Sequence, residues 1–141
     1  MKSAWMICLS LATLAQGLAS PVGLWRTINP ETQSVESLVR IVETPAGLSG
    51  RIERVLDPAK ATARCAACGG PRKDQPVQGM AIIEGVRRSA SGAHWDGGSI
   101  LDPKNGKTYK VRLTPLDGGK RLAVRGMLGP FHRDQFWERA E

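Results

Sequence analysis

The sequence predicts an all-β protein, and more specifically a closed antiparallel barrel of eight short strands. Three observations carry this prediction. Segments of alternating apolar and polar residues recur along the chain, and turn-forming residues separate them. A third is that all but one of the connections are short enough for hairpins, which join antiparallel neighbours. Closing such a sheet into a barrel removes its exposed edges.

Three of the predicted strands precede the longest irregular segment. In the third of them Leu48 and Ile52 fall on one face, while Ser49 and Arg51 fall on the other. This period of two is typical of a half-buried strand. Proline, asparagine and glycine supply the turns between these strands. The predicted ranges are Gly23–Ile28, Ser37–Glu43 and Leu48–Leu56.

The segment from Asp57 to Gln78 breaks the strand pattern. It contains several prolines, a pair of adjacent glycines and two cysteines, Cys65 and Cys68. Long loops without regular structure are uncommon in compact domains, and they are usually functional or mobile. We therefore predict one long irregular loop that carries the Cys65-x-x-Cys68 motif.

Five further strands follow this loop. The clearest of them alternates Tyr109 and Leu113 with basic and polar residues, and it follows an Asn-Gly turn that favours a hairpin. In the first of the five, the same spacing predicts that Ile82 and Val86 share a face. The predicted ranges are Gly79–Arg87, His94–Leu101, Thr108–Thr114, Arg121–Leu128 and Gln135–Arg139.

The first 19 residues have the layout of a cleavable signal peptide. Lys2 provides a positive start, an apolar stretch runs from Ala4 to Leu14, and Gly17 and Ala19 suit the last positions before cleavage. The apolar stretch is too short for a transmembrane helix, which needs about 20 residues. An uncleaved N-terminal anchor is the alternative.

Cleavage after residue 19 would leave residues 20–141 as a single β-barrel domain. No later apolar stretch is long enough to span a membrane as a helix. We therefore expect a periplasmic or secreted protein that is not transmembrane after processing.

The formal net charge of the chain is +7. Such a charge favours anionic partners, and an anionic envelope surface is the partner we consider. We expect no nucleic-acid binding, because basic and acidic residues are interspersed, as in Arg51 to Arg54, and export removes the usual nucleic-acid partners. The alternative is a charged surface that only keeps the protein soluble.

Cys65 and Cys68 are expected to form a disulfide in an oxidising compartment. As a structural bond that pins the long loop, it would contribute about 2 kcal/mol in the chain-entropy model. The alternative is a thiol–disulfide redox pair, although redox cysteines usually begin a helix in a βαβ unit. Haem attachment needs a histidine in place of Gly69, and a structural zinc site needs four ligands. We expect no metal and no cofactor.

The segment Gly23-Leu24-Trp25 resembles the G-x-W motif that opens lipocalins and their relatives. In those barrels the tryptophan closes one end, and an arginine from the last strand packs on its ring. The resemblance implies these roles for Trp25 and Arg139. A cation over a tryptophan face contributes about 0.5–2 kcal/mol.

The mature sequence as a whole resembles an uncharacterised family of small exported bacterial proteins, a domain of unknown function. The resemblance implies a lipocalin-like barrel in the bacterial envelope and no established activity. It is carried by Gly23 to Thr27, Gly50 to Ile52, Cys65 to Cys68, Asp74 to Met80, Gly97 to Tyr109, and Trp137 to Arg139.

The interior of an eight-stranded barrel is either filled by side chains or holds one small ligand. Both alternatives stay open from the sequence. Ligand sites of this kind are lined by apolar and aromatic groups with a few polar anchors. The candidate lining residues are Met80, Ile82, Tyr109, Val111, Leu113, Leu122 and Val124.

Catalysis has little support in the sequence. No G-x-S-x-G nucleophile motif is present. His94 and Asp96 could share a strand face as an acid–base pair, and an exposed hairpin end is the alternative. We therefore expect a protein that is not an enzyme.

Three functional hypotheses follow. The first is an exported lipocalin-like protein that binds a small amphipathic or lipid-like molecule. The second is a non-enzymatic envelope interaction protein with a filled barrel and a basic surface. The third is a thiol–disulfide redox protein that uses Cys65 and Cys68.

Overall fold

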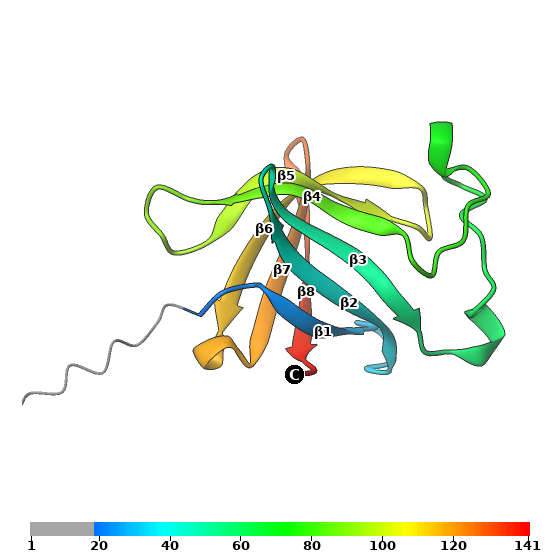
Figure 1. Ribbon diagram of the computed structural model, residues 1–141, viewed down its shortest axis with the longest axis horizontal. Coiled ribbons are helices and arrows are strands. Elements are labelled where there is room, and N and C mark those ends of the chain that lie inside the picture. Colours follow the sequence, from blue (N-terminus) through cyan, green and yellow to red (C-terminus); the bar gives the residue numbers. More distant parts are fainter. Residues whose placement is uncertain (1–18) are drawn as a thin grey trace, which may run out of the picture.

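A computed structural model describes residues 19–141 of the chain, so the predicted signal peptide lies outside the described residues except for Ala19. Eight antiparallel strands form a closed barrel in which each strand pairs with the next along the chain and the last returns to the first (Figure 1). The predicted fold class is therefore confirmed. The strands are β1 (Gly23–Ile28), β2 (Val35–Thr44), β3 (Gly47–Val55), β4 (Ala81–Arg88), β5 (Trp95–Asp102), β6 (Lys107–Leu116), β7 (Arg121–Leu128) and β8 (Phe131–Arg139).

Three short 3-10 helices interrupt the connections. η1 (Pro58–Lys60) and η2 (Gly70–Arg72) lie in the long loop between β3 and β4, and η3 (Asp117–Gly119) joins β6 to β7. Within the described residues, no helix has the length and apolar character needed to cross a membrane.

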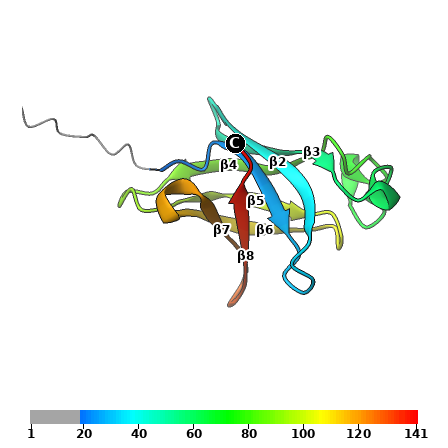
Figure 2. The same ribbon diagram turned by 90° about the horizontal axis from the view of Figure 1, so that it is seen from below.

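The barrel closes through a short seam between β1 and β8. Trp25 pairs with Arg139 and Arg26 with Glu138, whereas β7 and β8 pair along their whole length. The view from below shows β8 and β1 side by side at this seam (Figure 2). The seam lies at one end of the barrel, which we call the closed end. The opposite end, where the β1–β2, β3–β4, β5–β6 and β7–β8 connections lie, is called the mouth.

The last strand begins earlier than the sequence predicted. It starts at Phe131, immediately after the two-residue turn at Gly129 and Pro130, and its polar residues pair with β7. These residues have no apolar alternation, so their pattern did not predict a strand. Backbone pairing with β7 in the hairpin keeps them extended instead.

Apolar side chains fill the central layers of the barrel. Trp25 pairs with Val39 across β1 and β2, and Leu113 pairs with Val124 across β6 and β7. All four are at most 4% exposed. Successive residues of a strand point to opposite faces, so these pairs point inward while their neighbours point to the outer face.

Strand β4 pairs irregularly with β3 at two points, and this changes which side chains point inward. Leu48 and Gly50 are two positions apart on β3, but they pair with Val86 and Ile83, which are three positions apart on β4. A bulge of this kind puts Ile83 and Val86 on the same inner face. It corrects the sequence-based expectation that Ile82 shares a face with Val86.

The long loop covers part of the outer wall of the barrel. Ile82 and Leu101 continue the β4–β5 register on the outer face, and both are buried, at 7% and 4% exposed. The loop reaches this wall through Cys65, whose Sγ lies 3.4 Å from the carbonyl oxygen of Pro103. Cys65 and Cys68 of the loop belong to the same hydrophobic cluster as Ile82 and Leu101. The loop itself lies at the right of Figure 1.

Candidate functional site

The closed end is sealed by Trp25 and Arg139. The Trp25 side chain is fully buried, and its Nε1 donates to the carbonyl oxygen of Pro21 at 2.8 Å. The Arg139 guanidinium carbon lies 4.2 Å from the centroid of the indole ring, which is the arrangement that the lipocalin resemblance implied. Arg139 also donates to the carbonyl oxygens of Ser20 and Val22 at 2.8 and 3.0 Å. The polar atoms of this end are thus used in holding the N-terminal segment.

The candidate lining residues do not share one environment. Val111, Leu113, Leu122 and Val124 point inward and are at most 4% exposed. They pack with the other inward-facing side chains as core. The barrel centre is therefore filled by the residues that the sequence offered as lining.

The other three candidates lie near the mouth or outside the barrel. Tyr109 is half-buried and continues the inner face of β6 toward the mouth. Met80 is buried at the start of β4, where its carbonyl oxygen accepts from the backbone N–H of Ile52. Ile82 lies on the outer wall beneath the long loop. Only Tyr109 combines an inward position with partial exposure.

Two of the surface grooves in the described part of the chain bear on this question. One, of about 360 Å³, lies beside the long loop and is lined by residues between Arg72 and Glu84. The other, of about 470 Å³, lies at the closed end beside Arg26 and Lys120. Neither is lined by an inward-facing residue of the barrel centre. These grooves therefore give no support to the alternative in which the barrel interior holds a small ligand.

The inner face changes from apolar to polar toward the mouth. Above the pair of Trp25 and Val39, the next inward pair on β1 and β2 is Thr27 and Ser37. Their hydroxyl oxygens are 2.7 Å apart, and the backbone N–H of Ser37 donates to the Thr27 hydroxyl at 3.1 Å. The mouth thus begins one layer above the tryptophan.

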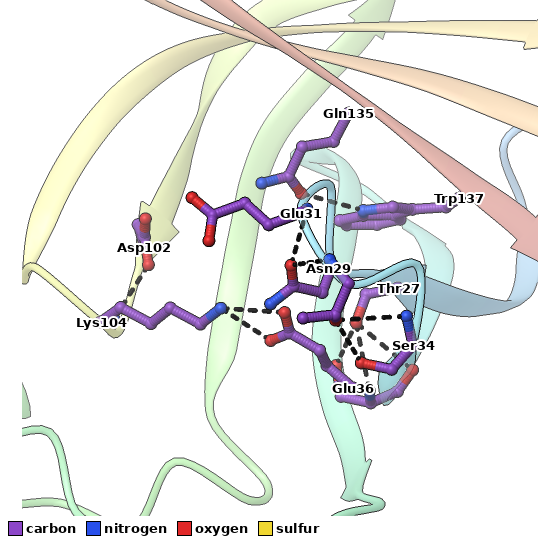
Figure 3. A network of polar contacts seen from close by, with 11 residues as sticks. Thr27, Asn29, Glu31, Ser34, Glu36, Asp102, Lys104, Gln135 and Trp137 are labelled. Carbon is purple, nitrogen blue, oxygen red and sulfur yellow. Dashed lines mark hydrogen bonds and ion pairs between the residues drawn. The ribbon is translucent and has the colours of Figure 1, made fainter.

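Gln135 presents a free amide donor at the mouth. It pairs with Val124 and therefore points inward, and its Oε1 accepts from Trp137 Nε1 at 3.3 Å. An indole N–H can only donate, so this contact fixes the amide orientation. The Gln135 Nε2 then makes no hydrogen bond within the described residues, and Figure 3 shows it directed away from Trp137.

Gly126 lies beneath the Tyr109 side chain of the neighbouring strand. It pairs with Val111 and so occupies an inward position on β7 without a side chain. A methyl group at this position would lie 3.5 Å from the Tyr109 Cβ, an ordinary contact. The tyrosine hydroxyl accepts from Asn105 Nδ2 at 2.9 Å, which holds the ring at the mouth.

A charged bridge crosses the mouth beside these groups. Lys104, in the β5–β6 turn, lies 3.0 and 2.8 Å from the two carboxylate oxygens of Glu36 on β2 (Figure 3). These two elements are not neighbours in the sheet, so the contact ties together two sides of the mouth. No spacing in the sequence signals this bridge, because the two residues are 68 positions apart.

The Cys65–Cys68 disulfide is buried in the long loop. The two Cα atoms are 5.3 Å apart, and the residues are 0% and 4% exposed. Disulfide exchange requires a thiolate to reach one sulfur. Burial prevents such an approach, and the geometry therefore favours a structural role over redox exchange.

His94 and Asp96 do come together. Their Nε2 and Oδ2 atoms are 3.0 Å apart, and Arg112 Nη2 lies 3.4 Å from the same carboxylate oxygen. Asp96 pairs with Arg87 on the outer face of the barrel, away from the mouth. Neither groove borders this cluster, so it acts as an ion-pair cluster on the outer wall.

A two-bond ion pair also lies on the outer wall. Arg125 Nε and Nη2 donate to the two carboxylate oxygens of Asp134 at 2.7 and 3.1 Å. The hydrogen bonds from this guanidinium hold the pKa of the Asp134 carboxyl below its ordinary value. The pair fixes the β7–β8 hairpin close to its tip.

Comparison with known families gives a match along almost the whole barrel. Residues 23–139 match the family described as "Uncharacterized protein conserved in bacteria (DUF2147)". The chain belongs to this family. No curated protein matches this DUF2147 protein.

Among solved structures, this DUF2147 protein is similar to protein HP1028 from the human pathogen Helicobacter pylori, which is described as belonging to the lipocalin family. The TM-score is 0.73, the sequence identity is 17%, and the match covers 87% of this chain and 84% of the other. The barrel is thus lipocalin-like, and the predicted family and fold are both confirmed. At this identity the likeness shows the fold alone.

Proposed function

We propose that this protein is an exported envelope protein that binds a small amphipathic molecule at the mouth of its barrel. A lipocalin-like fold suits ligand binding, because one end of the barrel is open to solvent. The packed centre leaves the mouth as the place where a ligand would contact inward-facing groups. This position differs from the deep interior site that the sequence first suggested.

The observation that carries the proposal is the unpaired amide of Gln135. Its Nε2 has no partner within the described part of the chain, while its Oε1 is held by Trp137. A donor that is fixed in direction and free of partners is prepared to meet an acceptor. Beside it, the half-buried Tyr109 ring, which packs over Gly126, supplies an apolar surface.

The polar and apolar groups together define the ligand class. An acceptor-rich or anionic head group would receive a hydrogen bond from Gln135, and Arg133, the next inward position on β8, forms no ion pair in the described residues. An apolar portion would lie on the Tyr109 ring. Small amphipathic molecules combine these two features.

Export is supported by the N-terminal sequence. Lys2, the apolar stretch and Ala19 fit a signal peptide, and cleavage after Ala19 would place the new terminus at Ser20. The carbonyl oxygen of Ser20 accepts from Arg139 at the closed end. The new amino terminus would therefore lie far from the mouth.

The test compares three forms of the mature protein with an anionic naphthalene sulfonate dye as the probe. Gly126→Leu would displace the Tyr109 ring that packs over this position. Ala123→Leu adds the same side chain to β7 at a position that faces outward. We expect dye affinity to fall at least about tenfold for Gly126→Leu and to stay unchanged for Ala123→Leu. The intrinsic tryptophan emission, to which Trp25, Trp95 and Trp137 contribute, should respond to the dye in the same order.

Native mass spectrometry of protein isolated from the envelope identifies the natural ligand. The proposal expects an added mass that organic extraction removes and that the Gly126→Leu protein lacks. Equal dye binding by all three folded proteins would reject the mouth as a site. Absence of both bound mass and dye binding would favour the filled-barrel interaction protein instead.

A further inference from the structure

The net positive charge of the chain is concentrated in one continuous segment. Eight of the 20 lysines and arginines, but only one of the 13 acidic residues, lie between positions 103 and 133. This segment therefore carries the whole net charge of +7, and the rest of the chain, with 12 residues of each sign, is neutral. It comprises β6, β7 and their flanking turns, which adjoin one another in the barrel.

The tip of the β7–β8 hairpin exposes large apolar side chains. Leu128 is 51% exposed and Phe131, its partner across the turn, is 77% exposed. Gly129 and Pro130 between them are also exposed and carry no charge. Phe131 has the highest exposed fraction among the large hydrophobic residues of the described chain.

Three basic side chains lie near this tip, and Asp102, which lies opposite one of them on β5, forms no ion pair with it in the described residues. Lys110 pairs with Met127 on the strand that leads to the tip, and Arg133 lies two positions beyond Phe131. Lys107 lies at the start of the neighbouring strand β6. All three are exposed, and none of them forms an ion pair within residues 19–141.

The hairpin also projects from the barrel. In the view from below, the β7–β8 turn extends beyond the neighbouring strands at the mouth end (Figure 2). The ion pair of Arg125 with Asp134 holds the two strands together just before the tip. A hairpin tip that projects, and whose strands an ion pair holds together, can reach a flat surface without any change in the rest of the barrel.

We propose that the β7–β8 hairpin docks the protein onto an anionic lipid bilayer. Leu128 and Phe131 enter the region between head groups and acyl chains, while Lys107, Lys110 and Arg133 contact the anionic head groups. An apolar tip with a basic rim is the combination that binds such interfaces, and each basic residue near an anionic surface strengthens the attraction.

The charge distribution favours a membrane over a second copy of the chain. Two copies meeting tip to tip would bring their Lys110 and Arg133 side chains together, which repels. Only two large apolar residues stand at the tip, so the binding would be reversible and sensitive to salt. The docked orientation would also hold the mouth near the membrane, although the docking does not depend on the proposed ligand.

The experiment measures binding of the mature protein to vesicles by sedimentation, at low salt. Vesicles containing phosphatidylglycerol are compared with vesicles of phosphatidylcholine alone. We expect the protein to bind the anionic vesicles at least about tenfold more tightly, and we expect high salt to release it.

A first pair of variants tests the apolar tip. The double variant Leu128→Ser with Phe131→Ser removes the tip, and the control Phe136→Ser removes another exposed phenylalanine of β8, away from the tip. The first should lose about tenfold or more in vesicle affinity, and the second should bind as the unaltered protein does.

Charge removal is tested with matched net charge. One variant replaces Lys107, Lys110 and Arg133 with glutamine, and the control replaces three exposed basic residues elsewhere, Lys60→Gln, Lys73→Gln and Arg87→Gln. The first should lose about tenfold or more in affinity for anionic vesicles, and the control should lose clearly less. Equal losses would show that only net charge matters and would overturn the proposal.

Two other outcomes would also overturn it. The first is failure of the unaltered, folded protein to bind anionic vesicles at low salt. The second is a dimer in sedimentation equilibrium that Leu128→Ser with Phe131→Ser dissociates, because the tip would then be an interface between two copies of the chain.

Discussion

The two ends of the barrel use the same kinds of residue in opposite ways. At the closed end, an aromatic ring and an arginine are fully engaged: Trp25 is buried, and Arg139 stacks on it while donating to backbone carbonyl oxygens. At the mouth, Gln135 keeps one donor free and Arg133 forms no ion pair in the described chain. Satisfied polar groups thus stabilise one end, whereas the proposed function assigns the unsatisfied groups at the other end to a ligand.

Replacing Trp25 with alanine gives the largest expected effect on stability. It removes a fully buried ring together with the surface on which Arg139 packs. We expect the free energy of unfolding to fall by about 3–5 kcal/mol, measured by urea denaturation. Tyr109→Ala at the mouth should cost clearly less. An equal loss at the two positions would remove the contrast between the ends.

The disulfide gives the next largest effect. Replacing Cys65 and Cys68 with alanine should lower the free energy of unfolding by about 2 kcal/mol, because the bond restricts the unfolded chain. The barrel pairing should persist, since the loop packs outside it. Circular dichroism together with urea denaturation checks both points. A dithiol that reduces the native bond at a mild potential would contradict its buried, structural position.

A substitution of Gln135 separates binding from stability at the mouth. Glutamate keeps an oxygen that accepts from Trp137 Nε1 and removes the free donor. We expect the free energy of unfolding to change by less than about 1 kcal/mol, while affinity for the anionic dye falls at least about tenfold. Stability comes from urea denaturation and affinity from fluorescence titration. Unchanged dye affinity would mean that Gln135 does not contact the probe.

The smallest expected effect concerns the ion pair of Arg125 with Asp134, close to the hairpin tip. The pKa of Asp134 is lowered in the folded protein, so its carboxylate stabilises the fold above the ordinary carboxyl pKa of about 4. This contribution disappears as the pH falls through the lowered value. Asp134→Asn should therefore be slightly less stable than the unaltered protein at neutral pH and equally stable in strong acid. A difference that persists in strong acid would assign the effect to another contact.

Several features of the fold could be predicted from local pattern. Alternation in Tyr109, Val111 and Leu113 and regular turn chemistry predicted the strand order and the barrel. The segment Gly23 to Trp25 and the final arginine indicated, through resemblance, which end is closed. These features were accessible because strand alternation and turn residues are properties of neighbours along the chain.

Other features could not be predicted from local pattern. The bulge in β4 moved Ile82 from the expected inner face to the outer wall, because it depends on how β4 pairs with β3. The early start of β8 depends on its pairing with β7. Both features depend on the register in which neighbouring strands pair.

The sequence alone determined the fold class and the cysteine pair, and it predicts export. Only the tertiary structure decided that four of the candidate lining residues fill the barrel, that Gln135 keeps a free donor, and that three residues of the basic segment lie near an exposed apolar tip. The physical reason is that burial, hydrogen-bond saturation and the position of charges in space depend on which strands are neighbours. A sequence read one residue after another records the side chains but not the groups that they meet.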